Sequence, residues 1–185
     1  MFFKKKIFVS LCFVFLITQA YASIKREIIQ NLENINTVSF NFEQNINGKI
    51  ENGSCLISYP KKIYCKYDSK NNKILVSNGN SIVIKTSSSY YLYSIDKTPL
   101  NFILDKDYLL KKILNNKKEI IDDKFINFEF FADENEINIF FDRNTYNLIG
   151  WQTKDIYQNT TLTLLGSISK NQKIEKKLFS LPVQN

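Results

Sequence analysis

The feature that most constrains this fold is a two-residue alternation of apolar and polar side chains, repeated in short segments. Val38, Phe40 and Phe42 alternate with polar residues, and Phe128 and Phe130 repeat the pattern later in the chain. Successive side chains of a strand point to opposite faces of a sheet, so this period predicts strands with one buried face. Turn signals such as Asn-Gly separate the segments and predict antiparallel neighbours joined by short turns. We therefore expect a mainly β fold.

Several segments of the chain have the pattern of strands, and a few have the pattern of helices. The expected strands cover residues 38–43, 50–59, 63–67, 73–77, 81–86, 90–95, 126–130, 137–141, 148–154 and 160–169. Helices are expected to begin at Ser23, as the N-cap of an apolar stripe, and at Pro99, with a further helical stretch over residues 108–114. This order predicts an α+β fold with one antiparallel sheet of about nine to eleven strands, which tends to curl at that size. The helices would cover its open side.

The N-terminal segment has the parts of an export signal. Three lysines precede an apolar run over residues 7–17, and small residues follow at the positions that a signal peptidase checks. We expect a signal peptide over residues 1–22, cleaved after Ala22, and a single domain over residues 23–185. The apolar run is shorter than the roughly 20 residues that a membrane anchor needs.

Cys12 raises the alternative of a lipoprotein signal, but its setting argues against acylation. Leu11 precedes it where a small residue is required, and more apolar residues follow it. The processed protein is therefore expected to carry no lipid of its own and to diffuse outside the cytoplasm.

Two cysteines remain after processing. Cys55 and Cys65 lie five residues on either side of Pro60, and a hairpin that turns there brings them to the same face. A cross-strand disulfide is allowed in an oxidising compartment, and two buried free thiols are the alternative. The sequence leaves both readings open.

The composition argues against most kinds of catalysis. The chain has no histidine, which is the commonest general base and metal ligand, and its few glycines form neither a P-loop nor a dinucleotide motif. The acidic pairs Asp122-Asp123 and Asp133-Glu134 lie in polar, turn-like stretches and are expected to be solvated. We expect no enzyme activity, no metal and no cofactor.

Loss of the signal lowers the net charge from +7 to +4, because it removes three lysines and no acid. Interspersed charges argue against nucleic acid and leave a mild attraction to an anionic membrane or an acidic partner open.

Five short motifs follow one another in an order that is specific in combination. They are Phe42-Glu43-Gln44, the series Gly53, Pro60 and Tyr67, the run Leu75-Val76-Ser77-Asn78-Gly79, Thr98-Pro99-Leu100, and the closing pair Phe179 and Pro182. In this order the chain resembles the outer-membrane lipoprotein carrier protein family, the LolA-like periplasmic chaperones. One position departs from the pattern, because Tyr59 stands where members often carry an arginine that contributes to lid closure.

The resemblance implies an incomplete β-barrel, or half-barrel, whose apolar cavity holds acyl chains beneath a helical lid. Without the resemblance, the strand residues are typical of an ordinary packed core, and the helical residues are typical of a helix that is fixed on that core. The residues expected to line the cavity are Val38, Phe40, Phe42, Ile57, Ile63, Tyr67, Ile74, Val76, Ile82, Ile84, Phe128, Phe130, Ile139 and Trp151, and those of the lid are Pro99, Leu100, Ile103 and Leu104. The aromatic stretch 90–93 lines the cavity mouth or forms an ordinary amphipathic strand.

The function implied by the resemblance is that of a monomeric periplasmic chaperone. It would bind the acyl chains of lipoproteins and ferry them from an inner-membrane lipoprotein-releasing ABC transporter to the outer membrane, where a lipoprotein receptor or the membrane accepts them. A lipid- or glycolipid-binding protein or an envelope sensor domain on the same half-barrel is the alternative. A secreted structural β protein without ligand is a third class.

Overall fold

The computed structural model describes residues 24–121 and 124–184 of the chain. The predicted signal peptide, its cleavage after Ala22 and the predicted N-cap Ser23 lie outside these residues. The strands are β1 (Thr37–Ile46), β2 (Lys49–Ser58), β3 (Lys62–Tyr67), β4 (Ile74–Asn78), β5 (Ser81–Lys85), β6 (Tyr90–Ser94), β7 (Lys118–Ile121), β8 (Phe125–Ala132), β9 (Asn135–Asp142), β10 (Leu148–Lys154) and β11 (Thr160–Lys170). The helical elements are a helix over residues 24–33, the 3-10 turn η1 (Ile95–Lys97), α2 (Leu100–Ile103), α3 (Lys106–Asn115) and the 3-10 turn η2 (Lys176–Phe179).

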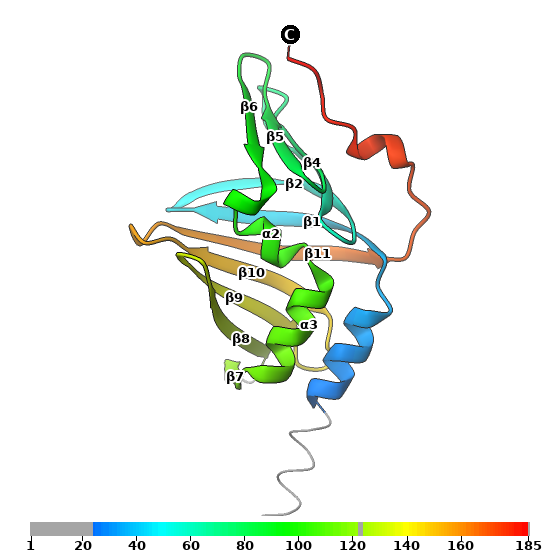
Figure 1. Ribbon diagram of the computed structural model, residues 1–185, viewed down its shortest axis with the longest axis vertical. Coiled ribbons are helices and arrows are strands. Elements are labelled where there is room, and N and C mark those ends of the chain that lie inside the picture. Colours follow the sequence, from blue (N-terminus) through cyan, green and yellow to red (C-terminus); the bar gives the residue numbers. More distant parts are fainter. Residues whose placement is uncertain (1–23, 122–123, 185) are drawn as a thin grey trace, which may run out of the picture.

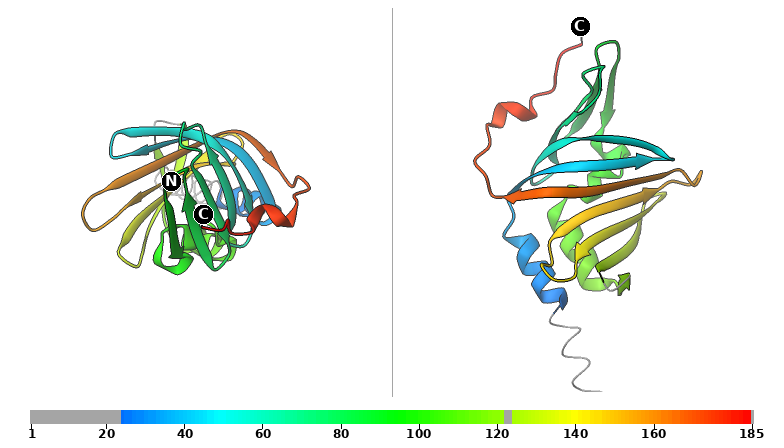
Figure 2. Two further views of the ribbon diagram at one scale, coloured as in Figure 1. Left: turned by 90° about the horizontal axis from the view of Figure 1, so that it is seen from above. Right: turned by 180° about the vertical axis from the view of Figure 1, so that it is seen from behind.

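The described strands form one 11-stranded sheet in the order β6-β5-β4-β3-β2-β1-β11-β10-β9-β8-β7. The sheet curls strongly, and its two edge strands, β6 and β7, stay apart (Figures 1 and 2). The predicted open half-barrel with an antiparallel sheet is confirmed. Strand β7 is an addition that the sequence pattern did not predict.

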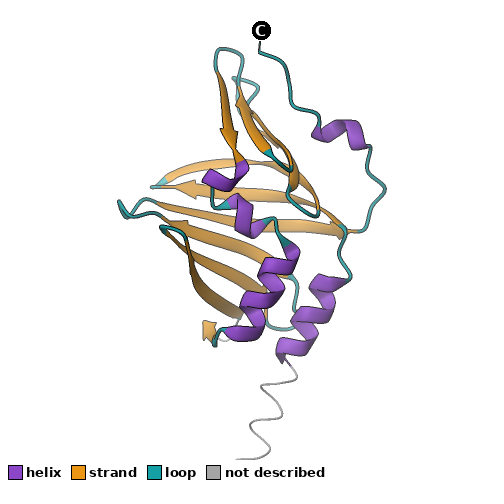
Figure 3. Ribbon diagram, viewed as in Figure 1, coloured by secondary structure: helices purple, strands orange, loops and turns teal. Residues whose placement is uncertain are grey.

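The connection between the two edge strands crosses the concave face of the sheet. From β6 the chain passes through η1, α2 and α3 and then enters β7 at the opposite edge (Figure 1). The helix over residues 24–33 lies beside α3, so the helices gather on the concave side (Figure 3). Among the described residues, no helix has both the length and the apolar character needed to cross a membrane.

The main core lies between these helices and the sheet. Ile28 and Leu32 of the first helix and Leu109 and Ile113 of α3 are buried there. They recur at three- or four-residue spacing, which places them on one face of each helix. The concave side of the sheet is therefore filled with side chains over much of its length.

Two lysines link the paired helices at both ends. Lys25, at the start of the first helix, donates from Nζ to the backbone oxygen of Asn116 at 2.6 Å, just beyond the end of α3. Lys106, the first residue of α3, donates from Nζ to the backbone oxygen of Glu33 at 2.9 Å. The helices thus run in opposite directions, and each supplies a cation to the carbonyl end of the other. This arrangement satisfies free carbonyls and favours both helix dipoles.

A second apolar layer covers the outer, convex face of β3, β4 and β5. Val76 and Val83 are paired neighbours on that face and are both buried. The segment after β11 returns to this face, where η2 lies on β3 and β4 and Phe179 is buried. The segment that contains the closing Phe179 and Pro182 motif therefore covers the outer face of the sheet at β3 and β4.

The prediction that Ile74 and Val76 face the inside was wrong. The register pairs Leu75 with Ile84 and Ser77 with Ile82, so Leu75 and Ser77 share the inner face. Ile74 and Val76 must then point outward, because neighbouring residues of a strand alternate between faces.

Candidate functional site

A pocket of about 400 Å³ opens on the concave side, between α2 and two walls of the curled sheet. Strands β4, β5 and β6 form one wall, and β1, β10 and β11 form the other. Its volume is within the range of ligand sites in proteins, about 300–1,000 Å³. The lining residues are Gln44, Leu75, Ile82, Ile84, Tyr93, Lys97, Thr98, Pro99, Leu100, Ile103, Trp151, Thr153 and Thr161.

The structure brings several predicted residues together at this pocket. From the expected cavity lining these are Ile82, Ile84 and Trp151, and from the expected lid they are Pro99, Leu100 and Ile103. Leu104, the fourth lid residue, is buried in the core and does not line the pocket. Tyr93 comes from the aromatic stretch for which the sequence left two readings open.

The other predicted inner residues lie in the packed core, outside the pocket. They are Val38, Phe40, Phe42, Ile57, Ile63, Tyr67, Phe128, Phe130 and Ile139. The ring of Phe40 meets Trp151 edge-on, with 6.2 Å between ring centroids, so Trp151 separates the pocket from this core. In this conformation these residues contact helices and neighbouring strands.

The tip of the β2–β3 hairpin contacts the junction between α2 and α3 through Lys61. The backbone N–H of Lys61 donates to the backbone oxygen of Leu104 at 2.8 Å. Its Nζ lies 3.3 Å from a carboxylate oxygen of Asp105. Both side chains of the ion pair are partly exposed, so it contributes at most about 1 kcal/mol. The backbone bond adds about 0.5–1.5 kcal/mol.

Lys61 lies two residues after Tyr59, the position at which the resemblance leads us to expect an arginine. Tyr59, which occupies the arginine position, packs against the core instead. Burial raises the pKa of the Tyr59 phenol.

Cys55 and Cys65 form a disulfide across the same hairpin. They are directly opposite in the β2–β3 register, with 4.1 Å between their Cα atoms. Both are buried on the inner face. The bond joins the two strands that lead to the Lys61 contact.

A chain of polar side chains crosses the sheet beside the pocket. The amide Nε2 of Gln44 donates to Oγ1 of Thr163 at 3.0 Å, and the Tyr67 hydroxyl donates to Oε1 of Gln44 at 3.4 Å. The Nζ of Lys73 lies 4.0 Å from the centre of the Tyr67 ring and pairs with Glu51. Gln44 belongs both to this row of polar side chains and to the pocket wall, so the row extends to the pocket.

Charge and burial set the protonation of this polar chain. Burial, and secondarily the charge of Glu51, raises the pKa of Tyr67 to about 12. Burial also tends to raise the pKa of Glu51, but hydrogen bonds and charges from Lys73 and Lys49 outweigh it and lower that pKa below 4.5. The site at neutral pH therefore holds a neutral phenol beside a formed ion pair.

The pocket wall next to this chain is also polar, with Thr153 and Thr161 paired on neighbouring strands. Sequence reasoning missed this wall, because single threonines in a strand give no periodic signal. Chemically, the pocket combines an apolar space for a hydrocarbon chain with hydroxyl and amide groups that can bond to polar groups of the same ligand.

Comparisons with known proteins give a family and a fold. The family described as "Outer membrane lipoprotein carrier protein LolA" matches residues 33–182. A putative outer membrane lipoprotein-sorting protein domain from Vibrio parahaemolyticus has a similar structure, with TM-score 0.50 and 8% sequence identity. The similarity covers 87% of this chain and 96% of that one. At this identity it concerns the fold alone.

A second solved structure is also similar. The lipoprotein LppX from Mycobacterium tuberculosis gives TM-score 0.47 and 12% identity over 85% of this chain and 99% of that one. No curated protein sequence matches the chain. Since the family match spans most of the sequence, the chain belongs to the outer membrane lipoprotein carrier protein LolA family.

Proposed function

We propose that this protein is a periplasmic carrier that holds the acyl chain of a lipoprotein in the pocket beneath α2. In this role it receives lipoproteins from an inner-membrane lipoprotein-releasing ABC transporter and delivers them to the outer membrane, to a receptor there if one is present. The observation that carries the proposal is the apolar pocket roofed by α2 in a chain of the lipoprotein carrier family. The role is one of binding and transport, without catalysis.

The free energy of acyl chains explains the need for such a pocket. Each exposed methylene costs about 0.8 kcal/mol, so transfer of about 14 methylenes from a membrane into water costs about 11 kcal/mol. A lipoprotein can cross an aqueous compartment only if a carrier replaces most of that burial. Loading is then either roughly isoenergetic with the membrane or driven, and because the sequence has no nucleotide-binding motif, we propose that any driving energy comes from a partner.

Several acyl chains need more space than the pocket offers in this conformation. Movement of α2 and α3 away from the sheet would add the core space lined by residues such as Phe40 and Phe128. This movement must break the Lys61 contact with the α2–α3 junction and the two lysine caps that join α3 to the first helix. The predicted cavity residues of the core are therefore proposed as lining of the opened state.

A sensor or carrier of other lipids is the second candidate. The polar wall of Gln44, Thr153 and Thr161 favours it, because a ligand with many hydroxyl groups, such as a glycolipid, gains more from that wall than a plain hydrocarbon chain.

The test is to identify what co-purifies with the protein from a bacterial periplasm. Equimolar acylated lipoprotein supports the carrier, and free phospholipid or glycolipid supports the second candidate. An Ile84→Glu variant places a charge in the pocket and is expected to abolish co-purification. Phe131→Glu, at an exposed position of β8 that lies outside both the pocket and the outer face of β3, β4 and β5, is the matched control and is expected to retain it. Equal retention by both variants would exclude this pocket as the binding site.

A further inference from the structure

Exposed lysines gather in two separate stretches of the sequence, residues 62–85 and 173–177. Five of them have exposed side chains and no ion-pair partner among the described residues: Lys62, Lys66, Lys70, Lys173 and Lys176. The carboxylates of these stretches are Asp68 and Glu175, and Glu175 is already paired with Lys177 at 2.8 Å. Both stretches therefore carry a strong local excess of positive charge.

The fold brings the two stretches to one surface. In β3, Lys62 and Lys66 alternate with buried inner residues, so they point to the outer face. The element η2, which contains Lys176, lies on β3 and β4. The Nζ of Lys85 donates to the backbone oxygen of Val183 at 2.9 Å and thereby joins the C-terminal segment to β5. We call this surface of β3, β4, β5 and residues 173–183 the basic outer face.

Exposed aliphatic side chains lie among these lysines. Val183 is 78% exposed, Leu92 is 58% exposed and Leu178 is 37% exposed. Leu92 pairs with Val83, which places it on the outer side of β6. The basic outer face thus combines flexible cations with separate exposed aliphatic groups.

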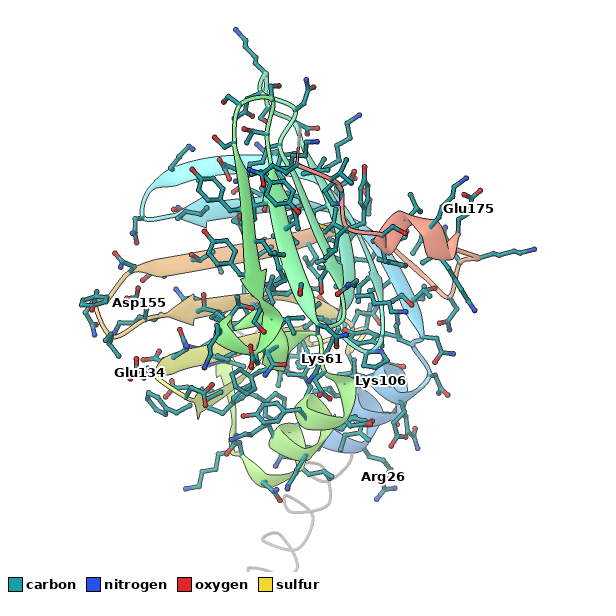
Figure 4. The ribbon with its side chains drawn as sticks, turned by 45° about the horizontal axis from the view of Figure 1, so that its top comes forward. Arg26, Lys61, Lys106, Glu134, Asp155 and Glu175 are labelled. Carbon is teal, nitrogen blue, oxygen red and sulfur yellow. A yellow bond between two sulfur atoms is a disulfide. The ribbon has the colours of Figure 1, made fainter. Side chains whose placement is uncertain are left out.

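We propose that the basic outer face docks on an anionic lipid membrane. Lysines near such a surface gain from its negative potential, while exposed aliphatic groups gain by insertion at the boundary of the acyl region. An acidic protein partner is less favoured, because paired recognition of carboxylates relies on arginine and both arginines of the chain lie elsewhere, at positions 26 and 143. Figure 4 places Arg26 at the helix end of the molecule, away from Glu175.

Docking in this orientation brings the pocket near the lipid. Strand β6 is an edge of the sheet, with Leu92 on its outer side and Tyr93 in the pocket wall. The pocket and the basic outer face therefore meet along one strand. This consequence for ligand transfer rests on the proposed carrier function, but membrane docking itself needs no occupied pocket.

The experiment is flotation of the full processed chain with vesicles. One set contains phosphatidylcholine alone, and the other contains equal parts of phosphatidylcholine and phosphatidylglycerol. We expect binding to the anionic vesicles alone, weakened by salt because surface charges are screened. The variant K62Q/K66Q/K173Q/K176Q is expected to bind about tenfold more weakly or worse, given the contribution of each lysine near a charged membrane.

A matched variant separates local charge from net charge. R26Q/K111Q/K117Q/K124Q also removes four exposed cations, all of them outside the basic outer face, and is expected to keep most of the binding. Equal loss in both variants, or no preference for anionic vesicles, would overturn the proposal. Binding to polyglutamate without binding to anionic vesicles would assign the face to an acidic protein and would also overturn it. If an Ile84→Glu variant loses its ligand but still floats with the anionic vesicles, membrane docking does not depend on ligand binding in the pocket.

Discussion

Replacement of Lys25 and Lys106 by methionine removes both links between the first helix and α3. Methionine keeps most of the apolar stem, so the change is mainly the loss of two ammonium groups that cap carbonyls. A hydrogen bond to a charged group is worth about 1.5–3 kcal/mol when buried, but these lysines are partly solvated. We take about 1 kcal/mol for each, consistent with a cation at a helix C-terminus. The double variant should therefore favour separation of the helices by about 2 kcal/mol.

This magnitude has two measurable consequences. The melting temperature should fall by about 4–8 °C, given the usual conversion for a chain of this size. If the pocket loads through separation of these helices, the open population should rise about thirtyfold, because each 1.4 kcal/mol is a factor of ten. Trp151 is the only tryptophan of the sequence and lines the pocket. Stopped-flow quenching of its fluorescence by a doxyl-labelled fatty acid measures the loading rate directly.

The matched control is Lys111→Met with Lys117→Met, since both lysines are exposed and lack side-chain hydrogen bonds or ion pairs among the described residues. It should change neither the melting temperature nor the loading rate. If the cap variant melts earlier but loads at the wild-type rate, the helices do not need to separate, and the reasoning fails.

Three further outcomes follow from the structure. Replacement of Cys55 and Cys65 by alanine should lower the unfolding free energy in urea by about 2–3 kcal/mol, the usual effect of a short disulfide loop. Gly53→Ala should cost more than 2 kcal/mol, since an added methyl group overlaps the backbone of β3 and an inner aromatic ring, whereas Gly166→Ala meets open space and should be nearly neutral in the same titration. The pKa of Glu51 is lower in the folded state, so its contribution to stability is present above about pH 4.5 and is lost as the pH falls; Glu51→Gln should make acid unfolding, followed by circular dichroism, less steep.

The sequence predicted the strands well where one face of the sheet is polar. In β1 the alternation of Val38, Phe40 and Phe42 with polar residues fixed both the strand and its inner face, and all three are buried. In β4 the run Ile74-Leu75-Val76 is apolar at every position, so no alternation reveals which face is inner. The outer face there is covered by a segment about 100 residues later in the chain, a contact that no local pattern encodes.

The candidate site was harder to predict than the fold. Whether Phe128 lines a cavity or a core depends on the position of α3, and an apolar pattern is the same in both cases. The contact of Lys61 with the junction of α2 and α3 also depends on the three-dimensional path of the hairpin, which no local pattern encodes. The resemblance placed the expected lid at Pro99 and Leu100, because Thr-Pro-Leu marks a helix start at a defined place in the chain, and both residues line the pocket.

The connection through η1, α2 and α3 is tethered to β6 at one end and to β7 at the other, so it is a strap across the half-barrel and has no free end. A strap of fixed length cannot swing aside as a flap does. To admit a bulky cargo, it must bow outward or draw on a change in the separation of the two sheet edges. Under the proposed carrier function, the width of the sheet and the ligand inside it would be mechanically coupled, and a partner that contacts only the outer edges could distinguish the loaded protein from the empty one. Spin labels on β6 and β8, measured with and without ligand, report that change in width.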